Sequence, residues 1–152
     1  MEARMKNPAM VLPDVMSGIQ TLTKAIRSGG VPQATLELVH MRASQINGCA
    51  ACINIGTRQA ATSGESTERL LQLPAWREAS CYSDAERAAL EMTEAATRLA
   101  DTPAAVTDAI WDAAAKHFDE RGLSAIILMI AITNFFNRIN TTVREPAEAR
   151  WA

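Results

Sequence analysis

Residues 38–52 read LVHMRASQINGCAAC, a helical pattern that is interrupted by a tight turn. Upstream of the turn, apolar side chains recur every three or four residues from Leu36 to Ala43, which is the period of an α-helix. Asn47-Gly48 breaks this pattern, and either residue can cap a new helix that carries Cys49 and Cys52 in its first turns. We therefore predict consecutive helices over about residues 32–46 and 48–64.

The rest of the chain repeats this alternation of helix and turn. Ser83 to Glu86 form a capping box, and Thr102-Pro103 is a second helix-start signal. Strand patterns are nearly absent, and no internal repeat is visible. Further helices are predicted over about residues 14–28, 66–71, 83–99, 102–118 and 123–143. The expected fold is all-α, a single-domain helical array of about six to seven helices over residues 1–152. Residues 1–12 are expected to form a loosely ordered arm, residues 14–143 the core and residues 144–152 a tail.

Length and composition limit the classes of function. The chain has 152 residues, 48% of them hydrophobic and 21% charged, which suits one globular domain. The net charge is −2 and no cluster of Lys and Arg occurs, so we expect no nucleic-acid partner. No long apolar segment follows the charged N-terminal residues, so we expect no secretory signal and a cytoplasmic location.

The longest apolar run lies at residues 123–132. It is too short to cross a bilayer and is followed by Asn134 and Asn137, so we interpret it as part of a buried helix and expect no membrane partner. This helix is apolar nearly all round. Such a helix is either buried on every side or covered by another subunit, and the sequence therefore predicts a homo-oligomer.

Cys49 and Cys52 form a Cys-x-x-Cys pair whose side chains lie on one face of a helix. The positive end of the helix dipole favours a thiolate there, so a reversible disulfide and a nucleophilic thiol are both reasonable. The alternative is that the two cysteines only pack as small buried side chains. The third cysteine, Cys81, lies in a predicted loop and is expected to stay unpaired.

Glu37 and His40 share one face of the preceding helix. The turn at Asn47-Gly48 can fold that helix beside the cysteines, where a carboxylate and an imidazole would form a proton relay for a thiol. Equally, both side chains could be solvated surface residues. A zinc site at His40, Cys49, Cys52 and Cys81 lacks a second close pair of ligands, so neither a metal nor a cofactor is expected.

Residues 38–52 closely resemble the signature of the alkylhydroperoxidase D-like proteins in the carboxymuconolactone decarboxylase superfamily. Three later segments resemble further landmarks of that family in the same order, namely residues 75–78, 83–90 and 137–140. The resemblance covers about residues 14–143. It implies an oligomeric all-helical fold and a thiol pair that reduces organic hydroperoxides. The decarboxylase branch of the superfamily does not depend on a Cys-x-x-Cys pair and is the less favoured assignment.

The resemblance also implies a role for each candidate residue. Cys52 would be the attacking thiol, Cys49 the resolving thiol, and Glu37 the carboxylate that deprotonates them through water. His40 matches a residue that is common among close relatives. The implied partners are an organic hydroperoxide and a thiol or dithiol reductant. Trp76 and Arg77 could help to line the pocket, or could equally be an aromatic side chain over a helix end and a surface arginine.

Position 56 departs from the family pattern, which has a histidine one helical turn after the second cysteine where this chain has Gly56. The missing imidazole would weaken peroxide turnover, and we expect Gly56→His to raise both rate and stability if the backbone leaves room. His40 could instead fill that role from the neighbouring helix. The alternative function is a redox-responsive or degenerate non-catalytic helical oligomer that binds a small ligand or a protein partner.

Overall fold

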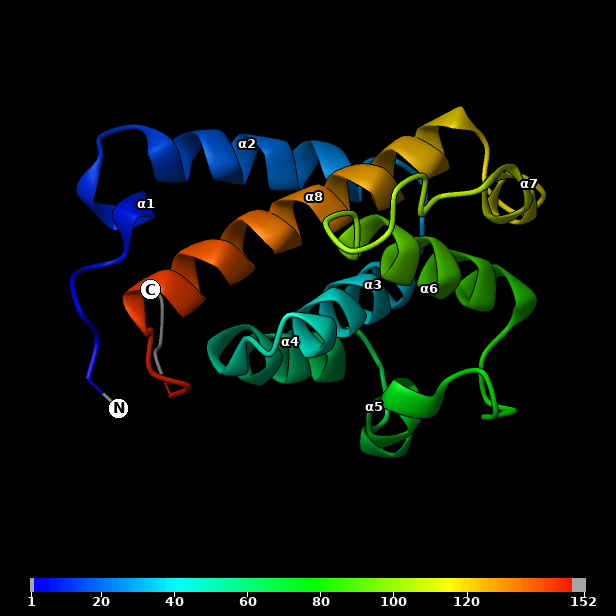
Figure 1. Ribbon diagram of the computed structural model, residues 1–152, viewed down its shortest axis with the longest axis horizontal. Coiled ribbons are helices and arrows are strands. Elements are labelled where there is room, and N and C mark those ends of the chain that lie inside the picture. Colours follow the sequence, from blue (N-terminus) through cyan, green and yellow to red (C-terminus); the bar gives the residue numbers. More distant parts are fainter. Residues whose placement is uncertain (1, 149–152) are drawn as a thin grey trace.

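A computed structural model describes residues 2–148, which are all helix, turn or irregular segment, without a strand (Figure 1). The α-helices are α1 (Pro8–Val11), α2 (Val15–Arg27), α3 (Gln33–Ile46), α4 (Ala50–Thr62), α5 (Thr67–Gln72), α6 (Asp84–Thr97), α7 (Asp108–Ala115) and α8 (Glu120–Val143). A short 3₁₀ helix, η1 (Leu73–Ala75), follows α5. The predicted all-α single-domain class is confirmed.

Helix α3 is the centre of the packing and is buried over most of its length. One face contributes Leu36 and Val39 to a core shared with α2, α6, α7 and α8. The other face contributes Leu38 and Met41 to a second core that includes residues of α4, α5, η1 and α6. Because α3 is covered on both faces, its polar residues must either find partners or face a cavity.

Helix α8 crosses the domain between α2 and the α3–α4 pair (Figure 1). By length and composition it is apolar enough to span a membrane, but half of its most apolar window is buried inside the domain, as in a core helix. Its outer face still leaves Ile127, Leu128 and Phe135 between 40% and 43% exposed.

A buried carboxylate joins α3, α6 and the turn after η1. Glu94 of α6 accepts hydrogen bonds from Arg42 Nε (2.7 Å), Trp76 Nε1 (2.9 Å) and Arg77 Nη1 (2.6 Å). Burial alone would raise the pKa of Glu94, but the hydrogen bonds from Arg77, Trp76 and Arg42 and the charge of Arg42 lower it to about 2. Glu94 is thus an ionised tie between three segments.

Two helix starts differ from the sequence-based prediction. The helix predicted from Thr102-Pro103 begins only at Asp108, because Ala104 takes a positive φ of 54° and Thr107 supplies the cap by accepting from the Ile110 amide. Helix α8 begins three residues earlier than the predicted start at 123, because the Asp119 side chain caps it.

The N-terminal arm contacts the end of α8. It contains the one-turn helix α1, and the Arg4 amide donates to the Val143 carbonyl at 2.8 Å. On the other side, Asn54 of α4 donates to the Ala147 carbonyl just beyond α8. Residue 1 of the predicted arm and residues 149–152 of the predicted tail lie outside the described residues.

Candidate redox site

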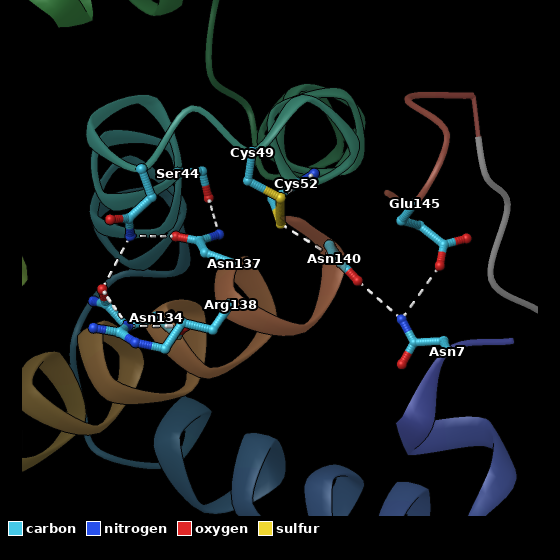
Figure 2. Close-up of a disulfide and its surroundings, with 10 residues drawn as sticks. Asn7, Ser44, Cys49, Cys52, Asn134, Asn137, Arg138, Asn140 and Glu145 are labelled. Carbon is cyan, nitrogen blue, oxygen red and sulfur yellow. Dashed lines mark hydrogen bonds between the residues drawn. A yellow bond between two sulfur atoms is a disulfide. The ribbon is translucent and has the colours of Figure 1, made fainter. Parts of the chain in front are cut away.

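Cys49 and Cys52 are joined by a disulfide at the start of α4, with their Cα atoms 5.3 Å apart (Figure 2). Cys49 is the N-cap of the helix, and its sulfur accepts a hydrogen bond from the Cys52 amide at 3.3 Å. Both residues are 3% exposed. The pairing and its place at a helix N-terminus agree with the prediction, and Cys81 is the free cysteine.

The turn before α4 is held against α8 by amide side chains. Gly48 has a φ of 64°, a backbone conformation that favours glycine. Asn47 donates to Asn134 (3.0 Å) and Asn137 (2.8 Å) of α8, and Asn137 donates to Ser44 of α3 (3.2 Å). These bonds fix the position of the disulfide relative to three helices (Figure 2).

A pocket of about 220 Å³ lies beside Cys52. Its lining is mostly apolar and includes Ile55, Met129, Ile132 and Phe136. Glu37, His40 and Asn140 also line it, whereas Cys49 does not. The Cys52 side of the disulfide is therefore the side that a molecule in the pocket would meet.

Glu37 and His40 are not solvated surface residues. Glu37 is 2% exposed; its Oε1 accepts from the Gln33 amide, and its Oε2 lies 3.6 Å from Nδ1 of His40. That separation allows an ion pair when the imidazole is protonated. The structure thus brings Glu37, His40 and Cys52 to one pocket, whereas no described contact joins Glu37 or His40 directly to the sulfur.

Gly56 has no room for a side chain. A Cβ atom there would lie 2.6 Å from the Met41 sulfur and 3.1 Å from Cε1 of His40. The expectation that Gly56→His raises rate and stability together therefore fails on its own condition of available space. The imidazole of His40 already packs against this position from α3.

Trp76, Arg77 and Cys81 lie away from this pocket. Trp76 is buried and binds Glu94, and Arg77 stacks on the Trp76 ring while also contacting Glu94. The Cys81 thiol faces the Gln72 side-chain oxygen at 3.8 Å. Within residues 2–148, no group of three or more His, Cys, Asp or Glu side chains is arranged to hold a metal ion.

Sequence reasoning assigned no chemical role to Asn140, which contacts the Cys52 sulfur, or to Asn7, which contacts Asn140. A signal was present, because Asn137 and Asn140 interrupt the apolar pattern of α8 at a spacing of three residues. The contact with Asn7 had no such signal, since 133 positions separate the two residues.

The fold and site define a class: an all-helical protein with a Cys-x-x-Cys disulfide at a helix start beside an apolar pocket. Residues 13–95 match the carboxymuconolactone decarboxylase family. The chain belongs to this family and is one of its alkylhydroperoxidase D-like members.

Two sequence relatives are themselves uncharacterized proteins. YdfG of Bacillus subtilis (strain 168) is 32% identical over 140 residues, which are 92% of this chain and 94% of YdfG. YnjA of Escherichia coli (strain K12) is 35% identical over 111 residues, which are 73% of this chain and 59% of YnjA.

Two solved structures share the fold. ATU0492 from Agrobacterium tumefaciens, a protein of unknown function that has been suggested to be the antioxidant defence protein AhpD, superposes with a TM-score of 0.87. It is 28% identical, with 98% of this chain and all of that chain covered. The debrominase Bmp8, solved with 2,3,4-tribromopyrrole, has a TM-score of 0.78 and 25% identity, with 90% of this chain and 72% of that chain covered.

Proposed function

We propose that the chain is a thiol-dependent peroxidase of the alkylhydroperoxidase type, which cycles Cys49 and Cys52 between dithiol and disulfide. The observation that carries this proposal is the pocket beside Cys52, where a buried carboxylate and an imidazole meet the thiol pair. Family membership and the redox-capable cysteine pair support it. The apolar lining favours an organic hydroperoxide over hydrogen peroxide as the substrate.

The reaction needs two electrons from the thiol pair. The Cys52 thiolate attacks the terminal oxygen of the hydroperoxide, so that a sulfur–oxygen bond forms, the oxygen–oxygen bond breaks, and the organic fragment leaves as an alcohol after taking a proton. Cys49 then attacks the Cys52 sulfenic acid, forming the disulfide and releasing water. An external thiol or dithiol reductant restores both thiols. The present disulfide corresponds to the oxidised end of this cycle.

Glu37 and His40 are the proposed proton-handling groups. Glu37 would take the thiol proton through water, and His40, held 3.6 Å from Glu37, would stabilise the carboxylate and share the proton. Because the ring of His40 packs against Gly56, this imidazole takes the place of the one that the family pattern supplies from position 56.

A turnover assay tests this proposal. The reduced protein should consume cumene hydroperoxide repeatedly in the presence of dithiothreitol, and Cys52→Ser should abolish consumption. Cys49→Ser should lose disulfide-dependent cycling but retain peroxide-dependent oxidation of Cys52, and Cys81→Ser is the matched control that should behave like the wild type. Disulfide formation without turnover would support the redox-responsive alternative instead, and inert thiols would support a non-catalytic ligand-binding protein.

Reductive dehalogenation is a second candidate, favoured by the apolar pocket next to Cys52 and by the likeness to the debrominase Bmp8. The two thiols would supply the two electrons that replace a carbon–bromine bond by carbon–hydrogen and release bromide. Incubation of the reduced protein with 2,3,4-tribromopyrrole tests this candidate. Bromide release in step with disulfide formation would support it, whereas hydroperoxide consumption without bromide release would reject it.

We also propose that the chain acts as a homo-oligomer in a reducing compartment such as the cytoplasm. Ile127, Leu128 and Phe135 expose apolar surface on one side of α8, which another copy would cover. Light scattering at micromolar concentration checks the assembly, and a mass of only 16.4 kDa would contradict it.

A further inference from the structure

Asn140 of α8 donates a hydrogen bond from its side-chain nitrogen to the sulfur of Cys52 at 3.2 Å (Figure 2). The amide is buried and also lines the pocket beside the disulfide. It is the hydrogen bond to the Cys52 sulfur within the described part of the chain, whereas the Cys49 sulfur accepts from the Cys52 backbone. The two sulfurs therefore have different partners.

The direction of the Asn140 amide follows from its neighbours. The Ala9 backbone N–H can only donate, and it donates to Oδ1 of Asn7 at 3.1 Å, so the Asn7 nitrogen faces the other way. That nitrogen donates to Oδ1 of Asn140 at 2.9 Å and to the Glu145 carboxylate at 3.5 Å. With its oxygen occupied by Asn7, Asn140 presents its nitrogen to Cys52.

The value of this donor depends on the charge of the sulfur. A sulfur in a disulfide or a thiol is a weak acceptor, whereas a thiolate is a strong one, so the bond strengthens when Cys52 loses its proton. Cys52 is almost completely buried, and burial by itself disfavours the charged form. A fixed amide donor offsets this cost at the atom where the charge develops.

We propose that Asn140 is a catalytic residue that stabilises the Cys52 thiolate, and that Asn7 of the N-terminal arm is a positioning residue that holds the Asn140 amide in the donating orientation. The step concerned is the ionisation of Cys52, in which only its S–H bond breaks and the proton leaves to the pocket base or to water. The catalytic role rests on the proposed thiol chemistry, whereas the effect on ionisation can be measured without any peroxide.

The decisive measurement is the pKa of Cys52 when it is the only thiol in the protein. In a Cys49→Ser, Cys81→Ser background, the pH dependence of alkylation by iodoacetamide reports the thiolate fraction. Asn140→Leu removes the donor at similar size and should lower the thiolate fraction at neutral pH by about tenfold or more, the range expected for a hydrogen bond to a charged group. An unchanged pH profile in the folded variant would overturn the proposal.

Asn7 is tested without altering the site itself. Asn7→Asp keeps the oxygen that caps α1 at Ala9 but loses the donor to Asn140, and it is made together with Glu145→Gln to avoid a new pair of carboxylates. The double variant should raise the pKa of Cys52, by less than Asn140→Leu, while Glu145→Gln alone should leave it unchanged. Equal profiles for the double variant and Glu145→Gln would overturn the role of Asn7.

The same variants separate this inference from the proposed function. They are repeated with both cysteines restored, and hydroperoxide consumption is measured across pH. A shifted Cys52 pKa in a protein that never consumes peroxide would uphold the donor and reject the peroxidase. A wild-type peroxidase whose rate and Cys52 pKa both survive Asn140→Leu would do the reverse. If Asn140→Leu does not fold, as judged by circular dichroism, the pair of Asn7 and Glu145 variants decides alone.

Discussion

Two buried carboxylates, Glu37 on α3 and Glu94 on α6, have very different surroundings. Glu94 is paired with three arginines and the Trp76 indole, which together lower its pKa to about 2 despite its burial. Glu37 receives one amide from Gln33 and lies beside His40 at the pocket that Cys52 lines.

The comparison shows that burial by itself does not separate a structural carboxylate from a candidate catalytic one. Glu94 has its charge matched and its oxygens occupied by three segments of the chain, so it stabilises the fold as a permanent anion. Glu37 has no arginine or lysine partner within the described residues and faces open volume. A carboxylate in that setting is available to exchange a proton with a molecule in the pocket.

The largest effect is expected at Glu94. Glu94→Gln leaves the half-buried Arg42 without its counter-charge, and we expect a loss of about 3 kcal/mol in the free energy of unfolding, as for other broken buried pairs. Urea denaturation measures this loss. Arg98→Ala, which removes only an exposed partner of Glu94, is the control and should cost less than about 1 kcal/mol. Similar values for both variants would contradict the structural role of Glu94.

Glu37→Gln should have the opposite profile. It keeps the shape of the side chain but not its basicity, so hydroperoxide turnover should fall about a hundredfold, the usual contribution of a general base. The free energy of unfolding should change by less than about 1 kcal/mol, because no buried cation loses its partner. Steady-state rates and urea curves on one preparation test both statements. A destabilised variant with normal turnover would make Glu37 a second structural carboxylate.

The contact between Gly56 and His40 sharpens the role of the Glu37 side. Gly56→His should lower stability by about 1–3 kcal/mol, the usual cost of overpacking, because its Cβ would overlap with Met41 and crowd His40. In a His40→Ala background the loss should be smaller, since the ring that crowds position 56 is gone. Thermal unfolding of the four proteins in this cycle gives the coupling. Purely additive losses would mean that His40 does not occupy the space at Gly56.

The smallest effect is expected from mild acid. The pKa of Glu94 is about 2 in the folded protein against 4.5 for the free side chain, so the unfolded state binds the proton first as pH falls. Its stabilising contribution is complete above about pH 4.5 and is lost progressively toward pH 2. At about pH 3.5 only part of that window is crossed, so the loss is smaller than that caused by Glu94→Gln.

The acid effect is measured as a difference. Urea curves at neutral pH and at about pH 3.5 are compared for the wild type and for Glu94→Gln, because other carboxylates also titrate in this range. The wild type should lose more stability than the variant. Equal losses would mean that the pKa of Glu94 is not lowered by its arginines.

Local patterns were sufficient for most of the helices, because capping residues and apolar spacing act within a few positions. The capping box at Ser83 to Glu86 was predicted and is present. The start at Thr102-Pro103 was wrong, because a nearby Thr107-Asp108 pair offers a competing cap, and local signals do not rank two such starts. The arrangement of Cys49 and Cys52 was also readable, since their spacing lies within one helical turn.

The sequence by itself thus determined the all-helical class, the thiol pair at a helix start, and the shared face of Glu37 and His40. The tertiary structure alone decided which carboxylate faces the pocket, that His40 occupies the space beside Gly56, and that Asn7 orients Asn140 toward Cys52. The physical reason is distance along the chain. Helix periodicity and capping act over three to four residues, whereas these contacts join side chains from separate helices and from opposite ends of the chain.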